Sequence, residues 1–100
     1  MRPWLALVAV VLAGLAAEAA LPPLEDSTDR PGADYQDFAL ATGAGPGVCR
    51  ISCINDTNCE AFTYVNAGVA GEKPRCRLKK AVPAPVEDAC CVSGVKRSRR

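Results

Sequence analysis

The sequence predicts a small α+β domain that is held together by disulfide bonds. Hydrophobic residues make up 49% of the 100 residues; 16 of these 49 lie in the first 20 positions, and the remaining 33 are enough for one modest core. Several segments alternate polar and apolar residues, as strands do, and one short segment places cysteines at helical spacing. All 6 cysteines lie between Cys49 and Cys91, and a domain of this size needs covalent support because its core is small.

The first twenty residues have the order of a secretory signal. Arg2 supplies a basic start, residues 4–15 are almost entirely apolar, and residues 16–20 are mostly alanine. The small residues fit cleavage after Ala19, with Ala20 as the alternative. A membrane anchor is the competing interpretation, but the apolar stretch is shorter than the roughly 20 residues that a spanning helix needs. Export would place the cysteines in an oxidising compartment.

The mature chain is expected to start with a flexible lead-in over residues 21–31, which are rich in proline and charge. The domain itself is predicted over residues 32–96. Its first strand is expected at residues 34–40, where polar and apolar residues roughly alternate. A glycine-rich loop follows over residues 42–47, and its Pro46 suits the first turn of a helix.

Residues 48–54 are predicted to form a short helix. Cys49 and Cys53 are four residues apart, which places both sulfurs on one helix face. A central strand is expected at residues 60–66, where β-branched and aromatic residues gather. The aromatic side chains on one face of this strand, Phe62 and Tyr64, are read as core residues, with a sugar-stacking platform as the alternative.

The rest of the chain predicts two more strands. Residues 75–81 alternate, so their basic side chains should share one face. Residues 82–86 carry two prolines and are expected to be a connector. A last strand is predicted at residues 91–95, with Gly94 as a weak point or bulge, and residues 97–100 form a basic tail.

Composition argues against several classes of function. The chain has 0 histidines, which removes Ser-His and Cys-His nucleophile pairs and any Cys/His zinc site. Its formal net charge of +1 gives no support for nucleic-acid binding. The acidic pairs Asp34/Asp37 and Glu87/Asp88 are interpreted as solvated surface groups. Residues 55–58 lack the regular acidic spacing of a calcium loop. We therefore expect no catalysis, no cofactor and no metal.

Six cysteines allow 15 pairings, and their spacing alone does not choose among them. However, Cys49, Cys53 and Cys59 run directly into Glu60-Ala61-Phe62-Thr63-Tyr64, and Cys76-Arg77-Leu78-Lys79 follows after a loop. This order resembles the PAN/Apple superfamily, particularly its short bacterial members, over roughly residues 29–96. The resemblance implies a curved antiparallel sheet with one helix packed across it. It also implies a Cys49–Cys76 bond and a Cys53–Cys59 bond.

Cys90 and Cys91 depart from the family pattern, since animal Apple domains join their two ends with a bridge that this chain lacks. Neighbouring Cα atoms lie about 3.8 Å apart, closer than the roughly 4.4–6.8 Å of ordinary disulfides. An adjacent Cys90–Cys91 bond is nevertheless the favoured prediction. An inter-chain bond and two free thiols are the alternatives.

The candidate ligand-binding residues are Arg75, Arg77 and Lys79, which should project from one strand face. Guanidinium groups pair bidentately with oxyanions, so this stripe could bind an acidic glycan. A solvated strand face is the alternative interpretation.

The resemblance implies an exported, non-catalytic binding module, secreted or periplasmic, for protein–carbohydrate or protein–protein recognition. The expected partner is a polysaccharide or an envelope or extracellular protein. No membrane span is expected once the signal is removed. The competing hypothesis is an accessory or inhibitory protein that caps a partner enzyme.

Overall fold

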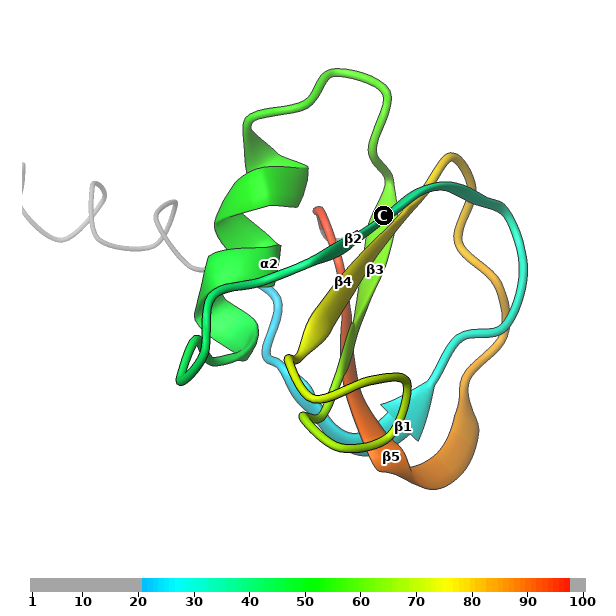
Figure 1. Ribbon diagram of the computed structural model, residues 1–100. Helices are drawn as coiled ribbons and strands as arrows, with labels where there is room; N and C mark the ends of the chain where they lie inside the picture. The colour runs from blue at the N-terminus through cyan, green and yellow to red at the C-terminus, as the bar shows by residue number, and fades with distance from the viewer. Residues whose placement is uncertain (1–20, 98–100) are drawn as a thin grey trace, which may run out of the picture.

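The computed structural model describes residues 21–97, which form a curved five-stranded antiparallel sheet with one helix packed on it (Figure 1). The elements are β1 (Glu25–Asp29), β2 (Asp34–Ala39), α2 (Pro46–Ile54), β3 (Ala61–Val65), β4 (Arg75–Lys79) and β5 (Val86–Val95). Their order across the sheet is β1-β5-β3-β4-β2. This confirms the predicted α+β fold. The predicted signal and the end of the basic tail lie outside the described residues.

Helix α2 begins two residues earlier than expected, at Pro46. The ring of Pro46 fixes a helical φ angle, and its missing N–H would lack an intrahelical partner in the first turn. Cys49 and Cys53 are both fully buried, so the helix turns its cysteine face toward the sheet. The helix ends at Ile54, and the backbone N–H of the C-cap residue Asn55 donates to the carbonyl of Ile51 at 3.0 Å.

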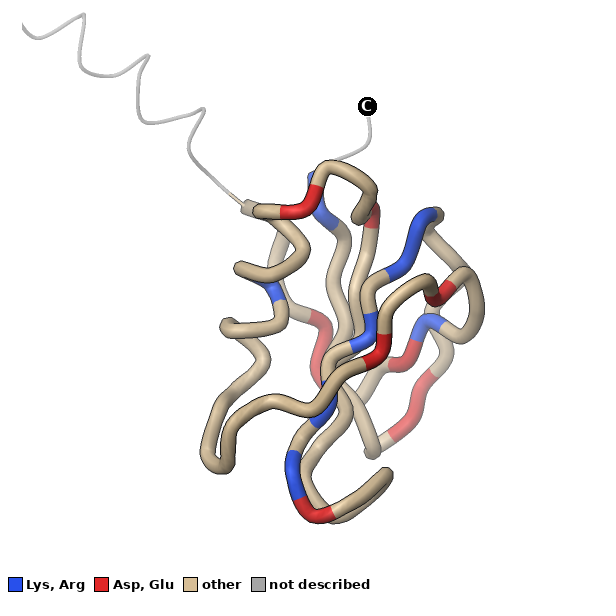
Figure 2. Tube along the Cα trace, turned by 45° about the horizontal axis from the view of Figure 1, so that its top comes forward, with Lys and Arg blue, Asp and Glu red and all other residues tan. Residues whose placement is uncertain are grey.

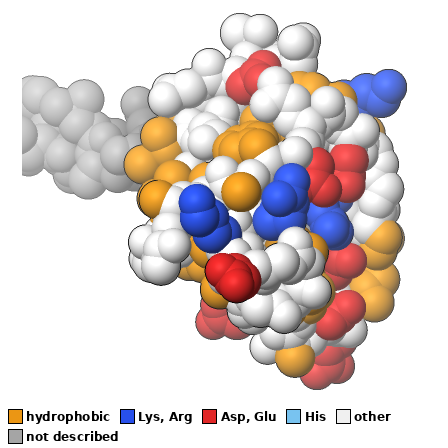
Figure 3. Space-filling model, in the orientation of Figure 1, with side chains coloured by type: hydrophobic (Ala, Val, Ile, Leu, Met, Phe, Trp, Pro, Cys, Tyr) orange, Lys and Arg blue, Asp and Glu red, His pale blue; other side chains and the backbone are white. Residues whose placement is uncertain are grey.

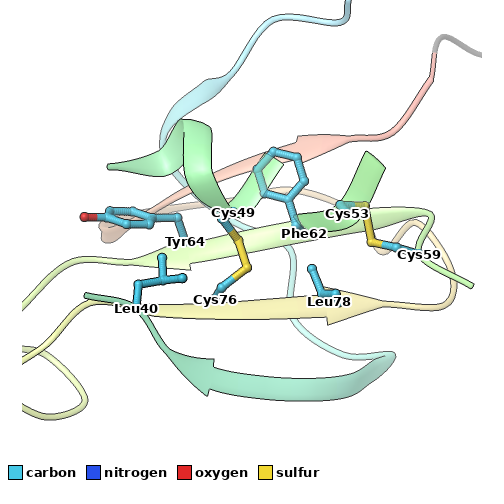
Figure 4. Close-up of a cluster of buried hydrophobic side chains, with 8 residues drawn as sticks. All are labelled: Leu40, Cys49, Cys53, Cys59, Phe62, Tyr64, Cys76 and Leu78. Carbon is cyan, nitrogen blue, oxygen red and sulfur yellow. A yellow bond between two sulfur atoms is a disulfide. The ribbon is translucent and has the colours of Figure 1, made fainter. Parts of the chain in front are cut away.

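The main core lies between α2 and the central strands (Figure 4). In the β3–β4 pair, Phe62 is opposite Leu78 and Tyr64 is opposite Cys76. Directly opposed residues share a face of the sheet, so these four side chains all point toward the helix. The prediction that Phe62 and Tyr64 are core residues is confirmed, since both are buried and Tyr64 Oη donates to the carbonyl of Ala44 at 2.6 Å.

Two disulfide bonds cross this core, and both predicted pairings are confirmed. Cys49–Cys76 joins α2 to β4 with Cα atoms 5.4 Å apart. Cys53–Cys59 joins the last turn of α2 to the residues before β3, with Cα atoms 5.2 Å apart. The helix is therefore covalently fixed at two points, one near its middle and one in its last turn. The third bond is the expected adjacent one, Cys90–Cys91, and no described cysteine is free.

The flexible lead-in expected at residues 21–31 is wrong for its central part. Residues 25–29 form β1, which pairs antiparallel with β5 along one edge of the sheet. The strand is entirely polar, so long-range contacts and not apolar burial hold it. Ser93 Oγ donates to the carbonyl of Thr28 at 2.8 Å. The guanidinium of Arg30 forms an ion pair with Glu25 at 2.8 Å and also donates to the carbonyl of Pro83.

Strand β5 begins at Val86, five residues before the predicted start. Its first half pairs with β1 and its second half with both β1 and β3. Thr28 pairs with Glu87 and Asp26 with Val92, so residues 88–91 lie opposite Ser27 alone. The Cys90–Cys91 bond therefore lies in an irregular bulge of β5, where four residues lie opposite one residue of β1.

The sheet face away from α2 is also covered, which gives the domain a second, smaller buried layer. Thr63 and Ser93 are fully buried there, and their hydroxyl oxygens are hydrogen-bonded at 2.7 Å. Arg30 joins β1 to the connector at Pro83, and this contact closes the end of that layer. The coverage of this face limits which strand residues can reach a ligand.

Candidate functional site

Two arginines on β4 share one carboxylate from the neighbouring edge strand. Asp37 on β2 pairs with Arg77 across the ladder. Its two carboxylate oxygens accept hydrogen bonds from Arg75 Nε at 2.7 Å and from Arg77 Nε at 3.2 Å. Arg75 Nη2 also donates to the Asp37 carbonyl at 3.1 Å. We call Asp37, Arg75 and Arg77 the arginine site.

The charge of Asp37 depends on its two arginine neighbours. Partial burial alone would raise the pKa of this carboxyl group. The hydrogen bond and positive charge of Arg75, together with those of Arg77, outweigh burial and lower the pKa below its ordinary value. Asp37 is therefore ionised at neutral pH and orients both guanidinium groups.

The arginine site keeps unused donors toward solvent. Both arginine side chains are about 30% exposed. Among the described residues, Arg75 Nη1 and both terminal nitrogens of Arg77 have no hydrogen-bond partner. On the face seen in Figure 3, basic side chains lie beside acidic ones and do not form an unbroken basic surface. Such a site favours an individual oxyanion over a long polyanion.

A shallow cleft of about 340 Å³ adjoins the arginine site. Arg75 lines it together with Lys73 and Ala39, and the loop before β4 supplies Ala70, Gly71 and Glu72. Gly71 has φ +125°, a backbone conformation that side chains rarely adopt, so glycine suits this loop. The cleft thus places a second basic side chain, Lys73, within the same recess as a guanidinium group.

Lys79 does not belong to this site, contrary to the prediction. Its side chain is on the same strand face as Arg75 and Arg77, but only 1% of the residue is exposed. Its ammonium group forms an ion pair with Asp34 and donates to the carbonyl of Gly32 at 3.2 Å. A buried ammonium requires such partners; Gly32 in the turn before β2 and Asp34 at the start of β2 supply them. Lys79 is therefore structural, and the candidate ligand-binding residues reduce to Arg75 and Arg77.

A second open cleft, of about 430 Å³, is lined by Tyr35, Thr57, Asn58, Glu60 and Lys80. The hydroxyl of Tyr35 is buried and has no hydrogen-bond partner among the described residues. Burial, and then the nearby Asp56 carboxylate, raise the pKa of Tyr35 to about 12. This cleft offers mixed polar groups of both charges, and it lacks the paired donors of the arginine site.

One group of potential metal ligands occurs in the described part of the chain. Atoms of Asp29, Cys90 and Cys91 lie within 4.8 Å of one another. The thiolate is the form of cysteine that binds metals, and here the two sulfurs are bonded to each other. In its disulfide form this group lacks the thiolates that a metal site would use.

Sequence reasoning identified the two arginines but missed the residue that organises them. Asp37 was read only as a surface acid in the first strand. The alternation of β2 places it on one face, but its position opposite Arg77 follows from the strand register, which the sequence does not state. The sequence does not place Lys73 beside Arg75, because its position in the cleft depends on the path of the loop before β4.

Comparison with known proteins agrees with this architecture. No curated protein matches the chain. Among the described residues, no helix is long and apolar enough to cross a membrane.

The PAN domain family matches residues 28–79, just over half of the chain. The matched segment contains β2 through β4, α2 and the Cys49–Cys76 and Cys53–Cys59 bonds. The chain therefore belongs to the PAN domain family, whose members are generally non-catalytic binding modules for proteins and carbohydrates.

Proposed function

We propose that the protein is an exported binding module that recognises an acidic carbohydrate through the arginine site. The observation that carries this proposal is the shared use of Asp37 by Arg75 and Arg77. One carboxylate holds two guanidinium groups in place, which lowers the conformational entropy that they lose when a ligand binds.

The unused donors define the chemistry of the ligand. Guanidinium groups bind carboxylate, sulfate and phosphate oxygens with two parallel hydrogen bonds. Arg77 keeps both terminal nitrogens free among the described residues, so it can donate such a pair while Nε stays on Asp37. A uronic acid or a sulfated sugar would present a suitable oxyanion.

The cleft beside Arg75 could accept the sugar ring next to that oxyanion. Its volume of about 340 Å³ is near the lower end of the roughly 300–1,000 Å³ of small-molecule sites. Lys73 and Glu72 supply a donor and an acceptor for hydroxyl groups. A site this small and open suits weak binding of one or two sugar units.

Glycan binding can be tested on an array of neutral, carboxylated and sulfated oligosaccharides. We expect retention of acidic members only, and weaker retention as salt rises because exposed charges are screened. Arg77→Gln should lower the affinity at least tenfold, since charge-assisted hydrogen bonds are the strong ones. Arg77→Lys should recover little of the affinity that is lost in Arg77→Gln, because an ammonium group does not donate in the same fork geometry.

Lys80→Gln is the matched control, because Lys80 is an exposed cation at the second cleft. It removes the same charge and should leave the affinity within about twofold. Equal losses in Arg77→Gln and Lys80→Gln would reduce the effect to net charge and contradict the proposed site. Recovery of one stoichiometric protein partner without glycan binding would favour the accessory-protein hypothesis instead.

Export can be tested separately by mass spectrometry of the protein recovered outside the cytoplasm. The order of residues 1–20 predicts a mature start at Ala20 or Leu21. An intact Met1 in a membrane-extracted fraction would contradict cleavage of the signal.

A further inference from the structure

Large hydrophobic side chains are exposed along one side of α2. Val48, Ile51 and Ile54 follow one another at three-residue spacing and are 45%, 57% and 40% exposed. Leu21, which is 53% exposed, lines the same shallow depression as Ile54. We call these four residues the helix patch. Figure 3 shows hydrophobic side chains at the surface on the side where α2 lies.

Basic residues border the helix patch. Arg50 and Lys96 line the depression beside Leu21 and Ile54, and its lining contains no Asp or Glu. Arg50 Nη2 donates to the carbonyl of Pro22 at 2.7 Å, which fixes the start of the described chain against the helix. Arg97 follows Lys96 and is exposed. Acidic residues lie at several places around the domain (Figure 2), and Asp56, two residues beyond Ile54, is one of them.

We propose that the helix patch and its basic border dock the protein on the surface of an anionic lipid bilayer. An amphipathic helix with an apolar side and flanking cations can lie in the membrane interface, with its apolar side among the headgroups and upper acyl chains. Arg50, Lys96 and Arg97 would then face the negative surface potential of anionic lipids. This surface is separate from the arginine site, so the inference goes beyond the proposed function.

The shape of the helix patch favours a lipid surface over a protein partner. The depression between Leu21 and Ile54 has essentially no free volume, so it offers no pocket for an anchoring side chain. The patch also has no aromatic residue, whereas protein hot spots are enriched in Trp, Tyr and Arg packed in pockets. A bilayer requires neither feature, because it adapts to a convex apolar surface.

Vesicle co-sedimentation of the exported protein tests the proposal. Vesicles of pure phosphatidylcholine are compared with vesicles containing 30% phosphatidylglycerol, at low salt and in 0.5 M NaCl. We expect binding to the anionic vesicles at low salt and strong weakening by salt. Ile51→Asp should lower the partition coefficient at least tenfold. Arg97→Gln should lower it about fivefold on anionic vesicles only.

Val69→Asp is the matched control, because Val69 is 56% exposed, almost the same as Ile51, but lies in the loop before β4. It adds the same charge and should leave vesicle binding within about twofold. Equal binding by Ile51→Asp and wild type would overturn the proposal. No binding to either vesicle would also overturn it. Glycan binding should persist in Ile51→Asp, so failure of this inference is distinct from failure of the arginine site.

Discussion

Gly94 on β5 lies opposite Phe62 on β3, and the aromatic ring fills the space that a side chain at position 94 would need. A Cβ atom there would lie 2.5 Å from Cζ and 2.8 Å from Cε1 of Phe62. Phe62 is only 1% exposed, so its ring has little room to move. Gly94 is therefore a packing requirement of the core and not a weak point of the strand.

Gly94→Ala should lower the free energy of unfolding by about 1–3 kcal/mol, because extra volume in a packed core forces neighbouring side chains to shift. Urea denaturation followed by circular dichroism measures this change. Gly47→Ala is the control, since nothing lies within 4 Å of a Cβ at this position in α2. It should maintain or raise stability because alanine favours helix. A Gly94→Ala variant as stable as wild type would contradict the packing of Phe62.

Cys76→Ser should lower stability by about 2–5 kcal/mol, the usual range for native bonds in small secreted domains. The Cys49–Cys76 bond spans a sequence separation of 27 and holds α2 on β4. Thermal or urea unfolding provides the measurement, and non-reducing peptide mapping checks the pairing in the wild type. A map that joins Cys49 to Cys59 would contradict both the structure and the expected stability loss.

Tyr35→Phe should remove an alkaline transition in stability. An unfolded tyrosine ionises near pH 10, whereas the pKa of Tyr35 in the folded protein is about 12. Between these values the folded state keeps a proton that the unfolded state loses, so stability falls as pH rises from about 10 to 12. Urea midpoints at several pH values should fall less steeply in Tyr35→Phe.

The exported protein should be a monomer six hydrogens lighter than its fully reduced chain, because three disulfides form within it. Mild reduction should first add two hydrogens, at Cys90 and Cys91. Cys90 is partly exposed. The cysteines of the other two disulfides are fully buried: Cys49, Cys76, Cys53 and Cys59. Intact mass and a thiol-labelling reagent follow both steps. A dimer that reduction separates would show an inter-chain bond instead.

The central part of the fold could be predicted because local patterns and the family resemblance agree there. Residues 60–66 are rich in β-branched and aromatic residues, and residues 75–81 alternate; these two segments contain β3 and β4. Cys49 and Cys53 marked the buried face of α2 by spacing alone. The bond partners came from the family resemblance, since spacing allows many pairings.

The edge formed by β1 and the first half of β5 could not be predicted, because distant contacts hold it together. The polar segment 25–29 carries no apolar alternation, and it becomes a strand only where β5 is available to pair with it. Lys79 illustrates the same limit. Strand alternation predicted its face, but its burial depends on the turn at Gly32 and on Asp34.

The polar strand β1 also has a protective role. It pairs with β5, which is the longest strand of the described chain, with 10 residues. A shortened protein that starts at residue 32 would lose β1 and leave the backbone donors and acceptors of that edge open. Exposed strand edges of this length pair with other chains. By covering the edge of β5, the five polar residues of β1 therefore protect the protein against aggregation, although they contribute no side chain to the main core.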